Sequence, residues 1–485
     1  MKRLPCNILS FVIPAKAGIQ WAVVKTGRWM RCLDSLSFPR RREFRGNDEE
    51  KVVPCQQAGS ATRRTSLPRS RVKTLAATIA LTCPLLAPAQ DFLPTPERVR
   101  EAIEQQPEVR AADAALTQAR EDARALAAGP HETQLSVAPL RRRVNDDGPI
   151  KNYNEWTVEL SRTLRLPGKA ALDEESGARA VAAAGFRQGG VRHDAARGLL
   201  AAWMGWLRAE GVAAAAQARH DSLVRERAVL ARRLELGDAA RRDLDQLDAI
   251  LASAQAERQQ AQADAQAQRL MLASGFPQVP VPAQAPALPA PAPLEGASED
   301  WVARITAHDH ELAALEETVA RHRALARRAD AERMPDPTVG LRTFSERGGA
   351  ERGVGVVLTI PLGGERRDAE ARSQLAAAEA ARNQADAMRR DATRQARLAV
   401  TRAQLALSLW QAARAAQDAH AASLARQRRA WELGEIGLAE RLQAERLAAD
   451  AALTELRARA DAHEALLRVQ VDGHTLWDWD GGGAQ

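Results

Sequence analysis

Few residues in this sequence have the types and spacing that catalysis or metal binding needs. Of nine histidines, only His308 and His310 lie close together in the sequence. On a helix, residues two positions apart point in different directions, so this pair does not predict a metal site. There is no P-loop, HExxH or nucleophile-elbow motif, and Gly348, Gly349 and Gly353 fall in a predicted hairpin loop rather than in a βαβ unit. We therefore expect no enzyme activity, no catalytic residue, no cofactor and no bound metal.

The cysteines give no disulfide framework or thiolate metal site in the expected mature chain. They are Cys6, Cys32, Cys55 and Cys83. All of them fall before the end of residues 72–89, which have the basic start, apolar run and A-x-A cleavage motif of a signal peptide. The alternative is a short buried helix, which Pro84 and Pro88 disfavour. We expect residues 1–71 to be a mis-called or disordered extension.

The basic character of the chain is confined to its start. The formal net charge is +7, but residues 1–89 hold 16 of the 69 Lys and Arg and only 5 of the 62 Asp and Glu. The remainder has 53 basic and 57 acidic residues, so composition predicts no nucleic-acid-binding face on the mature protein. Aromatic residues make up only 4% of the chain, which favours extended helices over a thick globular core.

One pattern occurs twice between about residues 92 and 472. Each copy reads as a helix, a β-hairpin, a very long helix, a Leu-Gly-acid break and another long helix. Three pairs of motifs mark the copies: Leu135-Ser136-Val137 with Val339-Gly340-Leu341, Leu166-Pro167-Gly168 with Ile360-Pro361-Leu362, and Leu236-Gly237-Asp238 with Leu433-Gly434-Glu435. The duplication strengthens each strand prediction, because each strand has an equivalent in the other copy.

The element boundaries follow from hydrophobic periodicity and from proline and glycine positions. We expect a first repeat over 90–275, a Pro-rich linker over 276–298, a second repeat over 299–472 and a tail over 473–485. Hairpins are predicted at about 133–163 and 338–361, and long helices at about 169–234, 240–273, 365–431 and 437–471. Shorter helical segments are predicted over 95–129, divided at Pro107, and over 299–332.

The long helices exceed what a compact domain needs. A helix of about 65 residues spans on the order of 100 Å at 1.5 Å per residue. After the predicted signal peptide, no run of 18 apolar residues occurs, so we expect no transmembrane helix.

The four predicted strands alternate apolar and polar residues, which is the weak signature of an outer-membrane strand. The residues predicted to face lipid are Leu135, Val137, Trp156, Val158, Leu160, Val339, Leu341, Val356, Leu358 and Ile360. The alternative is two ordinary hairpins half-buried on a helical bundle. Four strands cannot close a membrane barrel, so membrane insertion requires several chains to pool their strands: a trimer gives twelve and a tetramer sixteen.

This arrangement resembles the TolC-type outer-membrane efflux proteins over about residues 92–472. The resemblance is carried by Asp336-Pro337-Thr338-Val339-Gly340-Leu341, by the strand exits Leu164–Gly168 and Thr359–Gly364, and by the two Leu-Gly-acid breaks. It implies a mainly α fold whose four strands per chain enter a 12-stranded barrel of a homotrimer in the outer membrane. It also implies a long periplasmic α-helical barrel, and a function as passive exit duct for an inner-membrane transporter and a periplasmic adaptor.

The resemblance further implies roles for the helix–helix turns. By motif, the adaptor-contact tips are Leu236, Gly237, Asp238, Leu433, Gly434 and Glu435. Glycine suits a tight turn that needs positive φ; the alternative is that both glycines are only helix C-caps with a solvated acid beside them. Asp243, Asp245 and Glu440 follow the turns and are candidates for the pore mouth, with solvated helix residues as the alternative.

Two other protein classes compete with the channel interpretation. A periplasmic adaptor also has a long helical hairpin, but one hairpin flanked by β-rich domains rather than two copies with four strands. A coiled-coil structural protein without a pore would lack the alternating hairpins. The heavy-metal branch is one possible subgroup of the family; the sequence identifies neither the cargo nor the pump.

Overall fold

The computed structural model describes residues 92–145 and 148–477. The predicted extension, the predicted signal peptide and all four cysteines lie outside these residues, as does most of the predicted tail. Among the described residues, no helix has both the length and the apolar character needed to cross a membrane.

The order of elements repeats. The first copy contains α1 (Pro96–Glu104), α2 (Pro107–Ala128), β1 (Thr133–Val144), β2 (Lys151–Thr163), α3 (Lys169–Glu235) and α4 (Arg241–Gly275). The second contains α5 (Ser298–Ala307), α6 (His310–Ala331), β3 (Thr338–Glu346), the short 3₁₀ helix η1 (Arg347–Gly349), β4 (Glu351–Thr359), α7 (Glu365–Glu432) and α8 (Leu438–Asp472). The predicted fold class, a mainly helical chain built from a duplicated helix–hairpin–long helix–helix unit, is confirmed.

Each short helical segment is divided near its middle, in the second copy without a proline. Pro107 begins α2, where its missing N–H costs little. The second copy, predicted as one helix over 299–332, breaks at His308 and Asp309. Asp309 caps α6 by accepting a hydrogen bond from the Leu312 N–H at 2.8 Å. The local Asp cap therefore does in the second copy what proline does in the first, and it places His310 at the start of α6.

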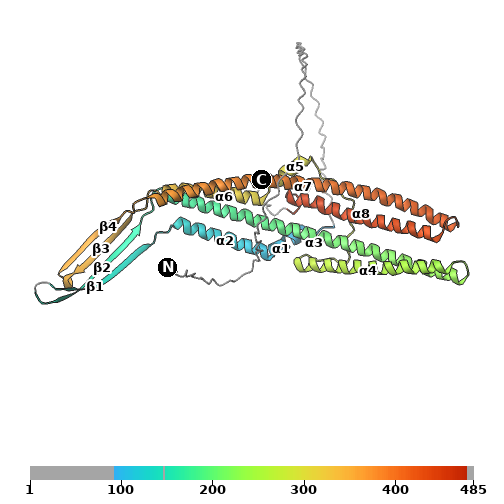
Figure 1. Ribbon diagram of the computed structural model, residues 1–485, viewed down its shortest axis with the longest axis horizontal. Helices are drawn as coiled ribbons and strands as arrows, with labels where there is room; N and C mark the ends of the chain where they lie inside the picture. The colour runs from blue at the N-terminus through green and yellow to red at the C-terminus, as the bar shows by residue number, and fades with distance from the viewer. Residues whose placement is uncertain (1–91, 146–147, 478–485) are drawn as a thin grey trace, which may run out of the picture. The chain divides into compact units, whose positions relative to one another are not determined.

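The strands form one antiparallel sheet in the order β1-β2-β3-β4. The two hairpins join through β2 and β3, where Leu160 lies opposite Leu341. Figure 1 shows the sheet continuing from the ends of α2, α3, α6 and α7. Strands β1 and β4 are the two edges, and neither has a second partner among the described residues.

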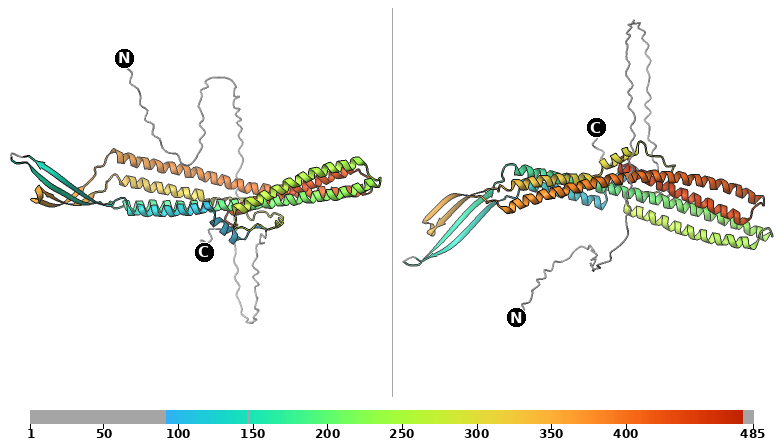
Figure 2. Two further views of the ribbon diagram at one scale, coloured as in Figure 1. Left: turned by 90° about the horizontal axis from the view of Figure 1, so that it is seen from below. Right: turned by 45° about the horizontal axis from the view of Figure 1, so that its top comes forward.

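The helices pack along their length as two hairpins. In Figures 1 and 2, α3 pairs with α4 and α7 pairs with α8, while α2 and α6 lie beside the parts of α3 and α7 nearest the sheet. Buried Ala371, Ala378, Ala385 and Ala392 follow a seven-residue spacing along α7, which is the spacing of a coiled-coil seam. Small side chains at these positions allow the helices to approach closely.

The largest apolar cluster lies where α1, α3, the end of α4 and the end of α8 meet. It includes Ile103, Leu199, Trp206, Leu272 and Trp477, all buried. The Pro-rich linker packs against this region: the Pro289 carbonyl lies 2.9 Å from His463 Nε2 on α8. Burial lowers the pKa of His463, while the hydrogen bond that its Nε2–H donates to the Pro289 carbonyl acts in the opposite direction. The linker is thus fixed to α8 rather than hanging between the repeats.

Candidate functional site

The sheet has one apolar face that the described chain leaves uncovered. Leu135, Leu160, Leu341 and Val356 lie side by side across all four strands and are exposed by 48–72% of their surface. Of the residues predicted to face lipid, only Val158 is half-buried and the others are exposed, with Ile360 just beyond β4. A large exposed apolar patch marks a surface that contacts something other than water. This arrangement disfavours the alternative of hairpins half-buried on a bundle.

The opposite face of the sheet is polar and internally paired. Arg342 donates to Glu159 at 2.7 Å across β2 and β3, and Arg142 donates to Glu155 at 2.7 Å across β1 and β2. A Cβ at Gly353 would lie 2.5 Å from the Phe344 ring, so the glycine makes room for that ring on the same face. An apolar and a polar face on one sheet is the pattern of strands between lipid and a water-filled interior.

A buried charged cluster joins the two repeats where the hairpins meet the helices. Lys169, at the start of α3, is 1% exposed and contacts Asp336 Oδ1 at 2.8 Å, the Met334 carbonyl at 2.7 Å and Glu332 Oε2 at 3.1 Å. Burial opposes ionisation of Asp336, yet hydrogen bonds from Lys169, the Leu166 N–H and His131 lower its pKa to about 2. Asp336, one of the residues that carried the family resemblance, therefore anchors the strand exits.

The first predicted tip is a tight turn between α3 and α4. Gly237 has a φ of 79°, and a Cβ there would meet nothing within 4 Å. The turn therefore requires glycine for its backbone angle rather than for space. Leu236 is 68% exposed, and Arg233 Nε donates to Asp238 Oδ2 at 2.8 Å. The apolar side chain points to solvent while the acid is held by its own helix.

The second predicted tip, between α7 and α8, has the same backbone but a different acid. Gly434 has a φ of 76°, and Leu433 is 58% exposed. The Glu435 N–H donates to the Ala430 carbonyl at 2.9 Å, as the Asp238 N–H does to Arg233 at 2.8 Å. None of the ion pairs found in the described ranges involves the Glu435 carboxylate.

One contact region links the two tips within the chain. The buried Arg441 of α8 lies over the Trp431 ring at 4.2 Å and forms an ion pair with Glu226 of α3. Arg233 approaches the same ring at 5.4 Å from the first hairpin. Desolvation lowers the pKa of Arg441, and its attraction to Glu445 only partly offsets this. The tips are therefore joined within the chain by Arg441, which lies between an aromatic ring and an acid, and by the approach of Arg233 to the same ring.

The candidate pore-mouth acids lie in or near the first turns of the returning helices. Asp243 is in the first turn of α4 and Glu440 in the first turn of α8, positions where the helix dipole favours negative charge. Asp245 is exposed and paired with Arg241 at 3.0 Å. Within one chain these contacts explain the acids as stabilising helix residues, and their role at a pore stays a prediction.

Folding also assembles a histidine group that the sequence pattern did not predict. His193, His310 and His474 each offer a nitrogen within 4.8 Å of the other two. They come from α3, from the start of α6 and from just after α8. His308 and His310 are close in the sequence, and in the structure His310 lies beside His193 and His474, which are more than a hundred residues away, while the His308 ring stacks on His474 at 4.6 Å. Only the packing of one repeat on the other could have indicated this group.

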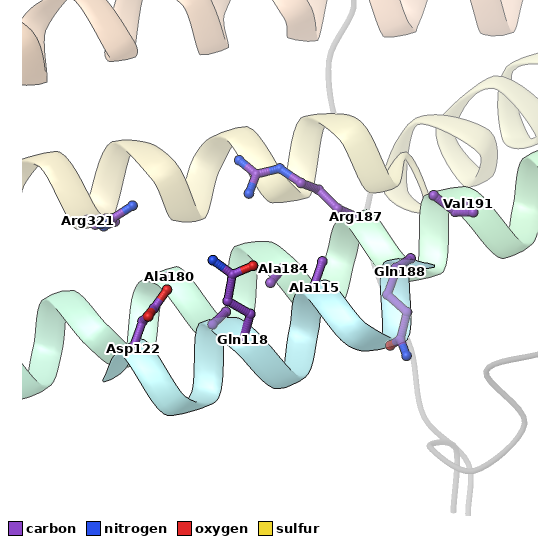
Figure 3. A pocket seen from close by; sticks show the side chains of 11 residues that line it. Ala115, Gln118, Asp122, Ala180, Ala184, Arg187, Gln188, Val191 and Arg321 are labelled. Atoms are coloured by element: carbon purple, nitrogen blue, oxygen red, sulfur yellow. The ribbon is translucent and has the colours of Figure 1, made fainter. Parts of the chain in front are cut away.

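A shallow cleft between α2, α3 and α6 is the other candidate for a binding site. It has a volume of about 320 Å³ and is lined by five alanines, by Val191 and by Gln118, Asp122, Arg187, Gln188 and Arg321 (Figure 3). Two of these polar residues already form bonds at the rim: Gln188 donates to Asp113, and Arg187 donates to Thr318 at 3.3 Å. The cleft is therefore a gap between small side chains rather than a built ligand site.

Comparison with known proteins gives matches only among solved structures, because no family model and no curated protein matches the chain. VceC, an outer membrane protein of Vibrio cholerae, is 17% identical over 78% of this chain and 95% of its own, with a TM-score of 0.64. The CmeC outer membrane channel of Campylobacter jejuni is 13% identical over 80% of this chain and 87% of its own, with a TM-score of 0.63.

The open-state MtrE outer membrane channel of Neisseria gonorrhoeae is 17% identical over 79% of this chain and 89% of its own, with a TM-score of 0.60. In each case the match extends over most of both chains, while the identity is too low to carry more than the architecture. Together with the duplicated hairpins, the two-faced sheet and the two glycine turns, these matches show that the chain has the fold of the TolC-type outer-membrane efflux proteins.

Proposed function

We propose that this protein is the outer-membrane channel subunit of a tripartite efflux system, acting as a passive exit duct. The observation that carries the proposal is the four-stranded sheet, apolar and exposed on one face, polar and ion-paired on the other. The long helices behind it reach on the order of 100 Å, enough to extend across a periplasm. Two copies of the helical hairpin, without β-rich flanking domains in the described ranges, disfavour the adaptor alternative.

The sheet requires partners in the membrane. Strands β1 and β4 are open edges, and an open edge in lipid leaves backbone groups unsatisfied. A homotrimer gives a closed barrel of twelve strands. Exposed leucines support contacts between copies: Leu398, Leu405 and Leu409 recur along α7 at coiled-coil spacing, and no residue of α7 after Ala403 is buried.

The mature protein, purified in detergent, tests this directly. We expect a heat-dissociable trimer on a denaturing gel, strand content by circular dichroism, and ion conductance when the trimer is placed in a planar bilayer. A mature protein that is monomeric and fully soluble without detergent would contradict the proposal.

At the tips, we expect the two exposed turns to dock onto the adaptor. Gly237→Val together with Gly434→Val places a branched side chain at positive φ in both turns, so the turns must rearrange. We expect export to be lost while the trimer still assembles, measured by reporter-substrate efflux and by gel. Gly185→Ala is the control, because a Cβ there also meets nothing within 4 Å but its backbone is helical. Loss of the trimer in the double variant would make the glycines structural instead.

A further inference from the structure

Three histidines meet at a point where both repeats contribute to the same cluster. His193 lies on α3 and is buried, while His310 and His474 are half-buried. The start of α6 and the end of α8 both reach α3 here. Among the residues that the structure describes, this is the one group of three or more metal-ligating side chains whose ligand atoms come this close together.

The centroids of the three imidazole rings form a triangle, and the ring of His308, outside the group, stacks on His474 with centroids 4.6 Å apart. The ring centroids of His193 and His310 lie 5.8 Å apart, those of His193 and His474 5.2 Å, and those of His310 and His474 5.3 Å. The His193 ring stands nearly perpendicular to both of the others, at 82° and 80°. Zinc, copper and nickel ions all bind well to imidazole nitrogen.

Two backbone features make room for this arrangement. A Cβ at Gly189 would lie 2.9 Å from two atoms of the His310 ring, so the His310 ring fits here only because residue 189 is a glycine. Gly189 lies four residues before His193, on the same face of α3. His474 has a φ of 53°, a left-handed conformation that residues with a Cβ seldom adopt and that is often found at functional sites.

A buried carboxylate lies behind the group. Asp472 Oδ1 is 3.4 Å from His193 Nε2 and accepts a hydrogen bond from Arg197 Nε at 2.7 Å. Histidine ligands of metals commonly have such a carboxylate partner, which orients the ring. Because Arg197 compensates the charge of Asp472, the affinity for a cation has to come from lone-pair donation by the neutral imidazole nitrogens rather than from net negative charge.

We propose that His193, His310 and His474 bind one divalent cation of the zinc class, which fastens the start of α6 and the end of α8 to α3. Nitrogens that share a zinc ion lie about 2.0–2.1 Å from it, and so at most about 4.2 Å from each other. Ring movements on the order of 1 Å therefore convert the observed group into a ligand set. Three protein ligands leave a fourth position for water, and the half-buried rings allow exchange with solvent. The proposal does not depend on the export function or on the cargo.

The test is a titration of the metal-free mature protein in detergent with Co²⁺, a visible-light reporter for zinc sites. We expect one Co²⁺ per chain with d–d absorption typical of low coordination, displacement by one equivalent of Zn²⁺, and a melting temperature that rises by several degrees with Zn²⁺. His193→Ala, His310→Ala and His474→Ala should each lower the Co²⁺ affinity by at least about 10-fold. His420→Ala, on α7 and outside the group, should bind as the wild type does.

Gly189→Ala tests whether the geometry of the site matters when all of its ligands are still present. All three histidines remain, but the new methyl group displaces the His310 ring, and we expect an affinity about 10-fold lower. Circular dichroism of each metal-free variant identifies variants that fail to fold, and Gly189→Ala then carries the test. Absence of the Co²⁺ bands in the wild type, or wild-type affinity in the histidine variants or in Gly189→Ala, would overturn the proposal.

Discussion

The two ends of the long helices hold the repeats together in different ways. At the strand end, Lys169 and Asp336 are buried and share contacts with backbone groups of both repeats. At the tip end, the repeats meet through Arg441, which is packed between Trp431 and Glu226, through Arg233 beside the same ring and through Leu442. A network of buried hydrogen bonds and ion pairs resists separation more than these few side-chain contacts do. Within one chain, the tip end is therefore the end that separates at lower free-energy cost.

The packing of the helices sharpens this contrast. In the first hairpin, Leu223, Leu230, Leu244 and Leu247 form a buried apolar cluster near the tip, to which the second hairpin contributes Leu442. The second hairpin has no comparable cluster of its own near its tip in the described chain, since no α7 residue after Ala403 is buried. The first tip is thus stabilised mainly by apolar packing within its own hairpin. The second tip depends on contacts with the first and, in the proposed trimer, with a neighbouring subunit.

Removing the lysine at the strand end should have the largest effect. Lys169→Ala leaves the buried Asp336 without its cation, although Glu332 keeps Arg328 and Arg367, and the loss costs on the order of 3–5 kcal/mol of unfolding free energy. We expect a large fall in the urea midpoint measured by circular dichroism. A loss no greater than that of Arg441→Ala would break the contrast between the two ends.

The aspartate of the same cluster should show a defined pH dependence. Its folded-state pKa of about 2 is below the ordinary value of 3.8, so its stabilising effect is complete above about pH 4 and is lost as pH falls through 2. We expect Asp336→Asn to cost on the order of 2 kcal/mol at neutral pH, and the difference from the wild type to disappear near pH 2. A difference that is constant with pH would show that charge is not the cause.

At the tip, Arg441→Ala should destabilise the protein less, by about 1–3 kcal/mol, because half-buried Glu226 loses its partner. Thermal unfolding in detergent measures this change. Arg227→Ala is the matched control: it removes an arginine–aspartate pair with Asp248 inside the first hairpin, where both groups are exposed, and should leave the melting temperature unchanged. Equal effects of the two variants would mean that the tips are not joined through Arg441.

Much of the fold could be predicted from the sequence because helices and strands depend on the local spacing of apolar residues. The strand with Trp156, Val158 and Leu160 alternates strictly, and its equivalent occurs in the second copy, so the apolar face of each strand follows from a period of two. The glycine turns were equally visible, since Gly237 and Gly434 each interrupt a long helical pattern and both have positive φ. What stays untested is what these turns contact.

The features that depend on packing between the repeats could not be predicted. Lys169 and Asp336 are 167 positions apart, and nothing in their neighbourhoods indicates that they share a buried site. Likewise, the spacing of His308 and His310 argued against a metal site because it considered one helix at a time. The structure shows that a break at Asp309 turns His310 toward two distant histidines.

The open edges of the sheet also bear on how such a protein matures. A single chain whose β1 and β4 edges were placed in lipid would leave two rows of backbone groups without hydrogen-bond partners. For a membrane-inserted sheet, insertion and subunit association then become one cooperative event rather than two consecutive steps. The rate of insertion should rise more steeply than linearly with the concentration of chains. Subunits that have not associated should stay uninserted and therefore exposed to proteolysis.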